Sequence, residues 1–227
     1  MKLSIPVVAT TLEQAKKDFK RIAEFADVVE LRIDNIPNLT SDGLKDLMTT
    51  KVTIPACVTN RSEEEGGKFA GPESARVKLL EYALEHGAEY VDVELATGTQ
   101  IIKRFLEKKR PKQQIVVSYH NFTQTPSFAV LEKVMQRQID AGASICKIVT
   151  FANSPEDNIQ IFKLIEAANQ IKQPIVSMCM GKLGQISRLT APLLGSYWTF
   201  ACEKAGGESA PGQIDYKTML SVWKIFT

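Results

Sequence analysis

The sequence predicts an α/β protein built as one closed (β/α)8 barrel with eight parallel strands, and three observations carry that prediction. Short β-branched runs alternate with longer amphipathic stretches along the whole 227-residue chain, a pattern typical of parallel βαβ units. Eight such units fit the length at which a single barrel forms. No linker, low-complexity tract or clear repeat divides the chain, so residues 1–227 are expected to form one domain.

Strands are expected where β-branched and aromatic residues gather in short runs. In chain order these runs are LSIPVVAT (3–10), DVVELRID (27–34), VTIPACVT (52–59), AEYVDVEL (88–95), QIVVSYH (114–120), SICKIVT (144–150), PIVSMCM (174–180) and GSYWTFAC (195–202).

Helices are expected between the strands, where apolar residues recur at helical spacing. The clearest of these amphipathic stretches are 12–25, 72–87 and 155–170. Pro72 and Pro155 suit the first turns of two of these helices. Gly87 and Gly142 suit the points where helices end.

Composition excludes several classes of protein. A net charge of +2 gives no reason to expect a nucleic-acid partner or a membrane surface. No apolar run approaches the ~18 residues that cross a bilayer, and MKLSIPVVATTLEQ lacks the features of a signal peptide. The four cysteines are far apart, which fits neither a zinc site nor a disulfide scaffold. We expect buried, reduced thiols in a cytoplasmic protein, with no metal.

The strands also predict charges inside the barrel. One parity of a barrel strand faces the helices and the other faces the lumen. In DVVELRID the apolar parity is that of Val29, which sends Glu30 and Arg32 inward; in YVDVEL the same reasoning sends Asp92 and Glu94 inward. Lumen layers built only for stability would use Val, Ile and Leu. These charges therefore indicate either structural ion pairs or a functional site.

A lysine inside an apolar strand raises the main chemical question. Lys147 lies between Cys146 and Ile148, although lysine is among the residues least often fully buried. Apolar neighbours and inward-facing arginines both disfavour the ammonium form, so we expect a depressed pKa and an amine that attacks a ketone or aldehyde. The alternative is a salt-bridged structural lysine.

The two histidines have different expected roles. His120 ends the strand before that of Lys147, where it is placed to move protons at neutral pH. Its alternative is a purely structural histidine. His86 precedes Gly87 at an expected helix end, so a capping role is favoured for it.

Six segments in order, each at the carboxyl end of an expected strand, resemble type I 3-dehydroquinate dehydratase, the Schiff-base dehydratase of the shikimate pathway. They are VVELRID (28–34), NRSEEEGG (60–67), VVSYHNF (116–122), ASICKIV (143–149), VSMCMGKLGQISR (176–188) and SAPGQID (209–215). The resemblance runs from the first strand to the last helix. It implies a TIM-barrel hydro-lyase that converts 3-dehydroquinate to 3-dehydroshikimate, losing water across C1 and C2 without metal or organic cofactor.

The resemblance also implies the catalytic residues. Lys147 would form an imine with the C3 ketone, and His120 would take the C2 proton and later protonate the leaving C1 hydroxyl. Glu65 matches the family carboxylate that orients this histidine. The acidic run by itself does not choose among Glu63, Glu64 and Glu65, and a solvated loop would have the same composition.

Further positions match residues that bind the substrate. Arg188 matches the arginine that holds the C1 carboxylate, although the residues alone would favour a surface arginine there. The remaining matches surround the ring hydroxyls, form the loop over the substrate, or line the pocket: Glu30, Arg32 and Arg61; Ser209 and Gln213; Met178 and Met180. Core packing would explain the two methionines equally well, and GGESAPGQ (206–213) suits a mobile lid.

Two departures from the family and two rival functions stay open. Some family members begin with a hairpin that plugs the lower end of the barrel, whereas this chain begins almost at its first strand, and its connection from second to third strand is short. The barrel floor and the oligomeric state therefore stay open, with a homodimer as the family expectation. The rivals are a class I aldolase, disfavoured because Glu208 would repel a phosphate, and a catalytically silent barrel.

Overall fold

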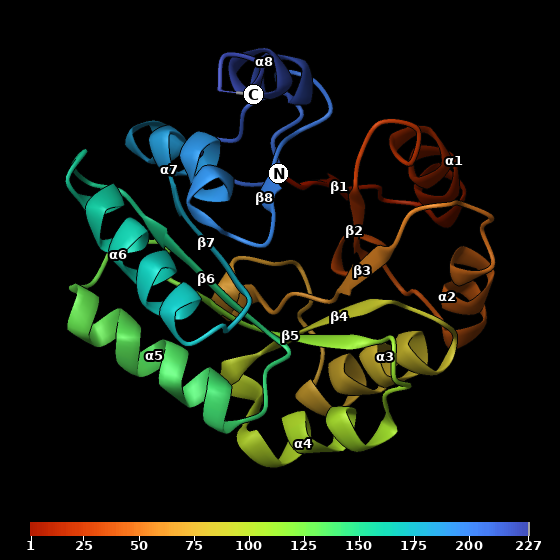
Figure 1. Cartoon of the computed structure of the whole chain (residues 1–227). Helices are drawn as coiled ribbons and strands as arrows, with labels where there is room; N and C mark the ends of the chain where they lie inside the picture. Colours follow the sequence, from red (N-terminus) through yellow and green to blue (C-terminus); the bar gives the residue numbers. More distant parts are fainter. Residues whose placement is uncertain (227) are drawn as a thin grey trace.

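The computed structural model describes residues 1–226 and has eight parallel strands surrounded by helices (Figure 1). The strands are β1 (Leu3–Val7), β2 (Val28–Arg32), β3 (Ala56–Thr59), β4 (Tyr90–Glu94), β5 (Gln114–His120), β6 (Ile145–Phe151), β7 (Ile175–Met180) and β8 (Thr199–Phe200). The sequence-based positions are confirmed, and the predicted barrel is confirmed with them.

The strands follow one another around the barrel, and β8 returns to pair with β1. Between β7 and β8 the wall is joined by the N–H of Tyr197, which donates to the carbonyl of Ile175 at 2.7 Å. Several strands are shorter than the expected runs, and β3 and β8 are shortened most. The expected run 52–59 becomes a strand only after Pro55, which cannot donate a ladder hydrogen bond. In the run 195–202 only Thr199 and Phe200 pair with β1.

Eight α-helices alternate with the strands. They are α1 (Leu12–Ile22), α2 (Ser41–Met48), α3 (Glu73–Glu85), α4 (Thr99–Lys108), α5 (Phe128–Asp140), α6 (Asp157–Gln170), α7 (Gln185–Thr190) and α8 (Tyr216–Trp223). Gly87 and Gly142 follow α3 and α5 with φ of +101° and +95°, as expected for helix ends. Pro72 and Pro155 were expected in first turns but lie just outside them, because each precedes the first residue of its helix.

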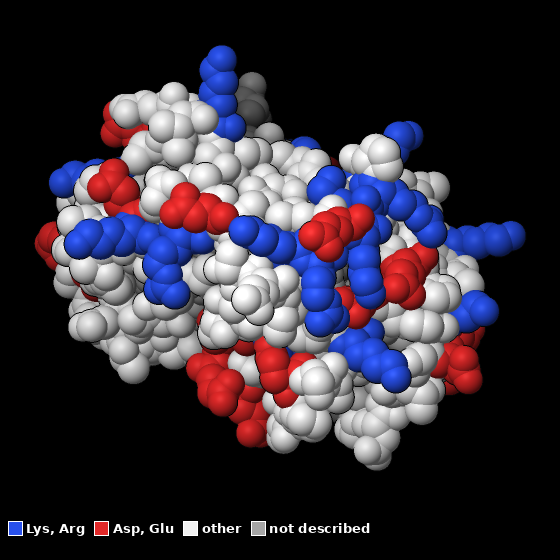
Figure 2. Space-filling view, turned by 90° about the horizontal axis from the view of Figure 1, so that it is seen from below, with Lys and Arg blue, Asp and Glu red and all other residues white. Residues whose placement is uncertain are grey.

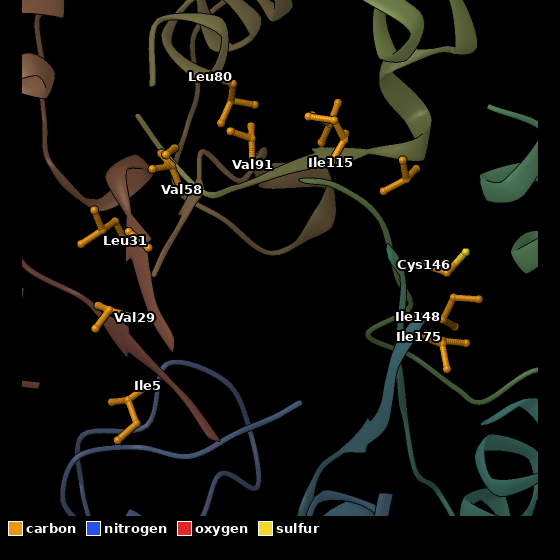
Figure 3. Close-up of a cluster of buried hydrophobic side chains, with 14 of the residues drawn as sticks. Ile5, Val29, Leu31, Val58, Leu80, Val91, Ile115, Cys146, Ile148 and Ile175 are labelled. Carbon is orange, nitrogen blue, oxygen red and sulfur yellow. The ribbon is translucent and has the colours of Figure 1, made fainter. Parts of the chain in front are cut away.

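The apolar parity of the strands packs against the helices. Val29, Leu31, Val91 and Ile148 are almost fully buried, and in Figure 3 they point away from the centre of the ring of strands. Burying a side chain of this size contributes ~1.5–3 kcal/mol. This packing fixes the strand register, so the opposite parity faces the lumen.

Aromatic side chains fill the lower lumen. Trp198 is fully buried and packs edge-on against Tyr90, with ring centroids 5.1 Å apart. The hydroxyls of Tyr90 and Tyr197 lie 3.4 Å apart, and the ammonium of Lys2 lies 4.4 Å from the Tyr197 ring. These residues belong to the amino-terminal ends of the strands, so they close the floor that the sequence left open.

Residues away from the lumen also match the sequence-based expectations. His86 caps α3 and its Nδ1 bonds to the carbonyl of Tyr82 at 2.9 Å. All four cysteines are buried and free of disulfides. On the face seen from below α4, Lys and Arg alternate with Asp and Glu (Figure 2), and Glu81 pairs there with Arg104 and Lys108. Positive and negative charges are therefore mixed on that face.

Residues 1–226 have neither a membrane-spanning helix nor a cluster of metal-binding side chains. None of their helices combines the length and apolar character needed to cross a membrane. In the same residues, no cluster of three or more His, Cys, Asp or Glu side chains is arranged to hold a metal ion.

Candidate active site

A cavity opens at the carboxyl ends of the strands. This is the end at which barrel enzymes carry their sites. All eleven residues predicted for the site line it: Glu30, Arg32, Arg61, Glu65, His120, Lys147, Met178, Met180, Arg188, Ser209 and Gln213. Five further lining residues were not predicted: Gly66, Phe122, Val149, Phe200 and Ala210.

Lys147 projects from β6 into the lumen, where two carboxylates meet it. Its Nζ donates to Oδ2 of Asp92 at 2.8 Å and to Oε1 of Glu30 at 3.2 Å. Burial lowers the pKa of Lys147, but Asp92 and Glu30 raise it more, and the net pKa lies above the ordinary lysine value. The expected depressed pKa is therefore wrong. Apolar neighbours and arginines favour a lower pKa for this lysine, but the inward carboxylates of β2 and β4 come close enough to outweigh them.

Arg61 joins the strands around this lysine. Its guanidinium donates to Asp92 at 2.7 Å, to Glu94 at 3.2 Å and to the hydroxyl of Ser118 at 2.7 Å. Burial lowers its pKa, but the surrounding carboxylates raise it well above the usual range. Asp92 is thus shared by Lys147 and Arg61, and despite burial these two cations hold its pKa well below the ordinary aspartate value. Asp92 therefore stays ionised in the lumen.

The loop after β3 selects one of the three consecutive glutamates. Ser62 caps a short 3-10 turn, Glu63–Glu65, by accepting from the N–H of Glu65. Glu63 and Glu64 are exposed on this turn, whereas Glu65 is buried. Its Oε2 lies 2.8 Å from Nδ1 of His120.

Gly66 and Gly67 let the loop turn this way. Gly66 has φ of +77°, and a Cβ there would lie 2.2 Å from the ring of Phe122. A Cβ at Gly67 would lie 2.1 Å from the carbonyl oxygen of Arg61. The two glycines therefore allow the close approach that brings Glu65 beside His120.

Burial has opposite effects on the two members of this pair. It raises the pKa of Glu65 to about 8, an effect that Arg61 opposes. It lowers the pKa of His120 well below the ordinary value, and Arg61 and Lys147 lower it further. His120 is therefore a neutral imidazole at physiological pH, with Nε2 left for a ligand.

Arg188 projects from α7 and is buried without a carboxylate. Its Nη1 contacts the sulfur of Met178 at 3.3 Å, and its Nη2 donates to the carbonyl of Pro211 at 3.2 Å. Its Nε has no hydrogen-bond partner, and no carboxylate of residues 1–226 lies within 4.0 Å of the guanidinium. Burial lowers its pKa to about 10. A buried, unneutralised guanidinium is a site for an anion.

The loop after β8 covers one side of the cavity. Gln213 accepts from the N–H of Ser209 at 2.8 Å, which holds the loop in a compact turn. The carbonyl of Pro211 accepts from the N–H of Gly181 at 3.0 Å. A Cβ at Gly212 would lie 2.2 Å from the carbonyl oxygen of Gly181, so glycine is required for this contact. Ser209 and Gln213 thereby reach the cavity.

Two aromatic residues of the site were missed by the sequence-based reasoning. The ring of Phe200 lies 4.7 Å from Nζ of Lys147, a cation–π distance. Phe122 packs near His120, with ring centroids 6.2 Å apart. Phe122 is two residues after His120 in VVSYHNF, so its closeness to the site could have been predicted from the sequence. Phe200 lies in the two-residue β8, where nothing in the sequence marks the lumen side.

Comparison with known proteins gives a consistent family. A model of the type I 3-dehydroquinase family matches residues 3–227. A protein of Methanocaldococcus jannaschii named 3-dehydroquinate dehydratase is 32% identical over 225 residues, with 98% of each chain covered.

Solved structures resemble the fold over nearly the whole chain. The type I 3-dehydroquinate dehydratase of Clostridium difficile superposes with a TM-score of 0.89 at 27% identity, covering 99% of this chain and 91% of its own. The enzyme of Geobacillus kaustophilus gives 0.84 at 30% identity, with 99% and 90% covered.

Proposed function

The chain belongs to the type I 3-dehydroquinase family and is a 3-dehydroquinate dehydratase of the shikimate pathway, and we propose that it acts through an imine formed on Lys147. The observation that carries this proposal is the composition of the cavity. One pocket contains the Lys147 amine, a histidine bonded to a carboxylate, and the unpaired guanidinium of Arg188. The aldolase and silent-barrel alternatives are set aside by the family membership.

Arg188 binds the C1 carboxylate of 3-dehydroquinate in this proposal. Its charge has no carboxylate partner, so the substrate supplies the one that is missing. A planar guanidinium suits bidentate recognition of a carboxylate. Binding at Arg188 directs the ring of the substrate toward Lys147, His120 and the remaining lining residues.

Imine formation is compatible with the raised pKa of Lys147. An ammonium and a ketone give a protonated imine and one water, so the positive charge stays on Nζ and no net proton is released. From ammonium to iminium the nitrogen loses two protons, one before attack and one from the carbinolamine, and the neutral His120 accepts each in turn and passes it to the departing oxygen, which leaves as water. Asp92 and Glu30, which stabilise the ammonium, then stabilise the iminium in the same place.

The iminium makes the elimination possible. It withdraws electrons from C2, so His120 removes a C2 proton and an enamine forms. The enamine electrons return toward C1, the C1–OH bond breaks, and His120 gives its proton to the leaving hydroxyl. One water is lost from C1 and C2, and hydrolysis of the imine regenerates Lys147.

Trapping with borohydride tests the imine. The protein is incubated with 3-dehydroquinate and borohydride, which reduces an imine to a stable secondary amine. The adduct is expected on the peptide that contains Lys147, with activity lost in step with labelling. Lys182→Ala should leave both unchanged, as a matched control from the next strand-end loop. An active Lys147→Ala variant, or an adduct at another lysine, would refute the mechanism.

We also propose a homodimer through α6 and α7. The α6–α7 face, which includes the short turns before and after α7, has exposed apolar side chains at Ile159, Leu183, Ile186 and Leu194, which are 41–50% exposed. Lys163 and Glu166 stand exposed on the same side of α6. In a two-fold arrangement with antiparallel α6 helices, each lysine would meet the glutamate of the other copy.

Light scattering during gel filtration tests the dimer. The protein should have twice its chain mass, and Ile186→Asp should reduce it to one chain. Val130→Asp, at an equally exposed apolar position on α5, should stay dimeric. A monomeric parent, or an unchanged mass for Ile186→Asp, would contradict this interface.

Buried free cysteines support a cytoplasmic location, testable by cell fractionation.

A further inference from the structure

Three arginines line the cavity, and they are not equivalent. Arg32, Arg61 and Arg188 could each hold a carboxylate by chemistry alone. Arg61 is neutralised by Asp92 and Glu94 within the lumen. The difference between Arg32 and Arg188 therefore decides at which of these two arginines a substrate carboxylate binds, and so how the substrate is oriented.

Arg32 is occupied by Asp34. Its Nε donates to Oδ1 of Asp34 at 2.9 Å and its Nη2 to Oδ2 at 2.8 Å, a bidentate pair. Burial lowers the pKa of Arg32, but Asp34 outweighs this and the pKa is raised. The face of the guanidinium that would grip a substrate carboxylate is thus already used.

Asp34 itself is held in place from several sides. Its side chain is fully buried, and Oδ2 also accepts from Nδ2 of Asn35 and from the N–H of Lys68, both at 3.2 Å. These bonds come from the turn after β2 and from the loop after β3. The carboxylate is therefore fixed before any ligand enters.

From this contrast we infer that Asp34 is a positioning residue that sets the orientation of the substrate. It neutralises Arg32, so Arg188 is the unneutralised guanidinium of the cavity and a substrate carboxylate is accepted at one end. Arg32 keeps N–H groups that serve uncharged hydroxyls. The inference rests on the proposed role of Arg188 and adds to it the group that prevents the reversed binding mode.

Asp34→Asn tests this inference because it removes the charge and keeps the volume. Arg32 should then become a second carboxylate site, and substrate should also bind in the reversed, unproductive orientation. Unproductive binding lowers kcat and KM by the same factor, here roughly three- to tenfold, and leaves kcat/KM nearly unchanged. Inhibition by succinate, a small dicarboxylate, should tighten roughly tenfold.

A second variant separates orientation from folding. Asp34→Asn combined with Arg32→Met removes the new anion site, so the excess inhibition by succinate should disappear. Glu203→Gln breaks a similar bidentate pair with Arg21 on the surface and should leave kcat, KM and inhibition unchanged. A fall in kcat/KM at unchanged KM, with no gain in succinate inhibition, would show that Asp34 only shapes the loop and would overturn the inference.

Failure of the proposed function would look different. If Arg188 did not bind the carboxylate, Arg188→Met would leave succinate inhibition of the otherwise unaltered protein unchanged. If Lys147 formed no imine, borohydride would leave no adduct, whereas succinate binding to Asp34→Asn, followed by calorimetry, would still tighten.

Discussion

Lys147 and Asp92 form a buried ion pair across the barrel, with Nζ 2.8 Å from Oδ2. The pair joins β6 to β4, and Glu30 of β2 completes it. A charged lysine would be a poor nucleophile if the reaction had to begin by releasing its proton to solvent. In the proposed mechanism the protonated imine keeps the same charge in the same place, so the ion pair would stabilise the iminium rather than obstruct its formation.

Asp92→Asn should therefore lower the pKa of Lys147 and yet reduce turnover. Without this carboxylate the pKa of Lys147 should fall, since burial and Arg61 remain to lower it. Acetylation of Lys147, followed by peptide mass mapping, should begin at lower pH. Turnover should nevertheless fall at least ~10²-fold, because the iminium loses a partner. An unchanged pH profile of acetylation would contradict the prediction. Glu203→Gln, which removes a surface carboxylate away from the cavity, is the control and should leave both the acetylation profile and turnover unchanged.

The Glu65–His120 pair predicts the pH dependence of kcat. An ionised Glu65 accepts from Nδ1–H of His120 and leaves the Nε2 lone pair free, whereas a protonated Glu65 donates to Nδ1 and the ring keeps its hydrogen on Nε2. Activity should rise with pH through the raised pKa of Glu65, toward 8. Activity rises rather than falls with pH because the carboxyl of Glu65 must lose its proton before His120 can act as a base.

Glu65→Gln tests whether Glu65 causes this rise of kcat with pH. An amide cannot titrate, so the rise in kcat should move away from the range near 8, while the protein remains folded. If the same limb persisted in Glu65→Gln, the titrating group would be another residue.

The sequence predicted this site because strand parity and family motifs constrain it closely. Alternation alone sent Glu30 and Asp92 into the lumen, and the motif chose Glu65 where composition could not. Parity states which way a side chain points, but not how near it comes to another strand. The distance from Lys147 to Asp92 depends on the tilt and register of β4 and β6, so the direction of the Lys147 pKa shift was wrong. The aromatic floor was unreadable for the same reason, because Tyr90 and Trp198 meet only when the barrel closes.

Gly66→Ala should damage the site through the backbone. Its φ of +77° and the closeness of Phe122 both oppose a Cβ, so we expect a loss of roughly 2–5 kcal/mol in unfolding free energy and lower kcat. Gly87→Ala has a similar φ but no atom within 4 Å, and should cost only ~1–2 kcal/mol with activity kept. Urea denaturation and kcat measure both. Equal losses for the two variants would mean that Phe122 does not constrain the loop.

Arg188→Met should make the protein more stable and less active. The buried guanidinium has no carboxylate within 4.0 Å, and its Nε has no hydrogen-bond partner, so the folded protein bears a desolvation cost that methionine removes. Replacing buried charges by apolar side chains of similar size often stabilises proteins by ~1–4 kcal/mol, and we expect a gain of about 1 kcal/mol or more in urea denaturation.

The same substitution should remove the partner of the substrate carboxylate. We therefore expect kcat/KM to fall at least ~10²-fold, mainly through KM. Arg188→Lys keeps the charge but loses the planar fork, so KM should lie between those of the parent and Arg188→Met. Arg76→Met is the matched control for stability, because Arg76 is equally buried but paired with Glu73 and Glu94; breaking those pairs should destabilise by ~3–5 kcal/mol. A destabilised Arg188→Met with unchanged KM would mean that Arg188 serves packing, and the carboxylate would have to bind elsewhere in the cavity.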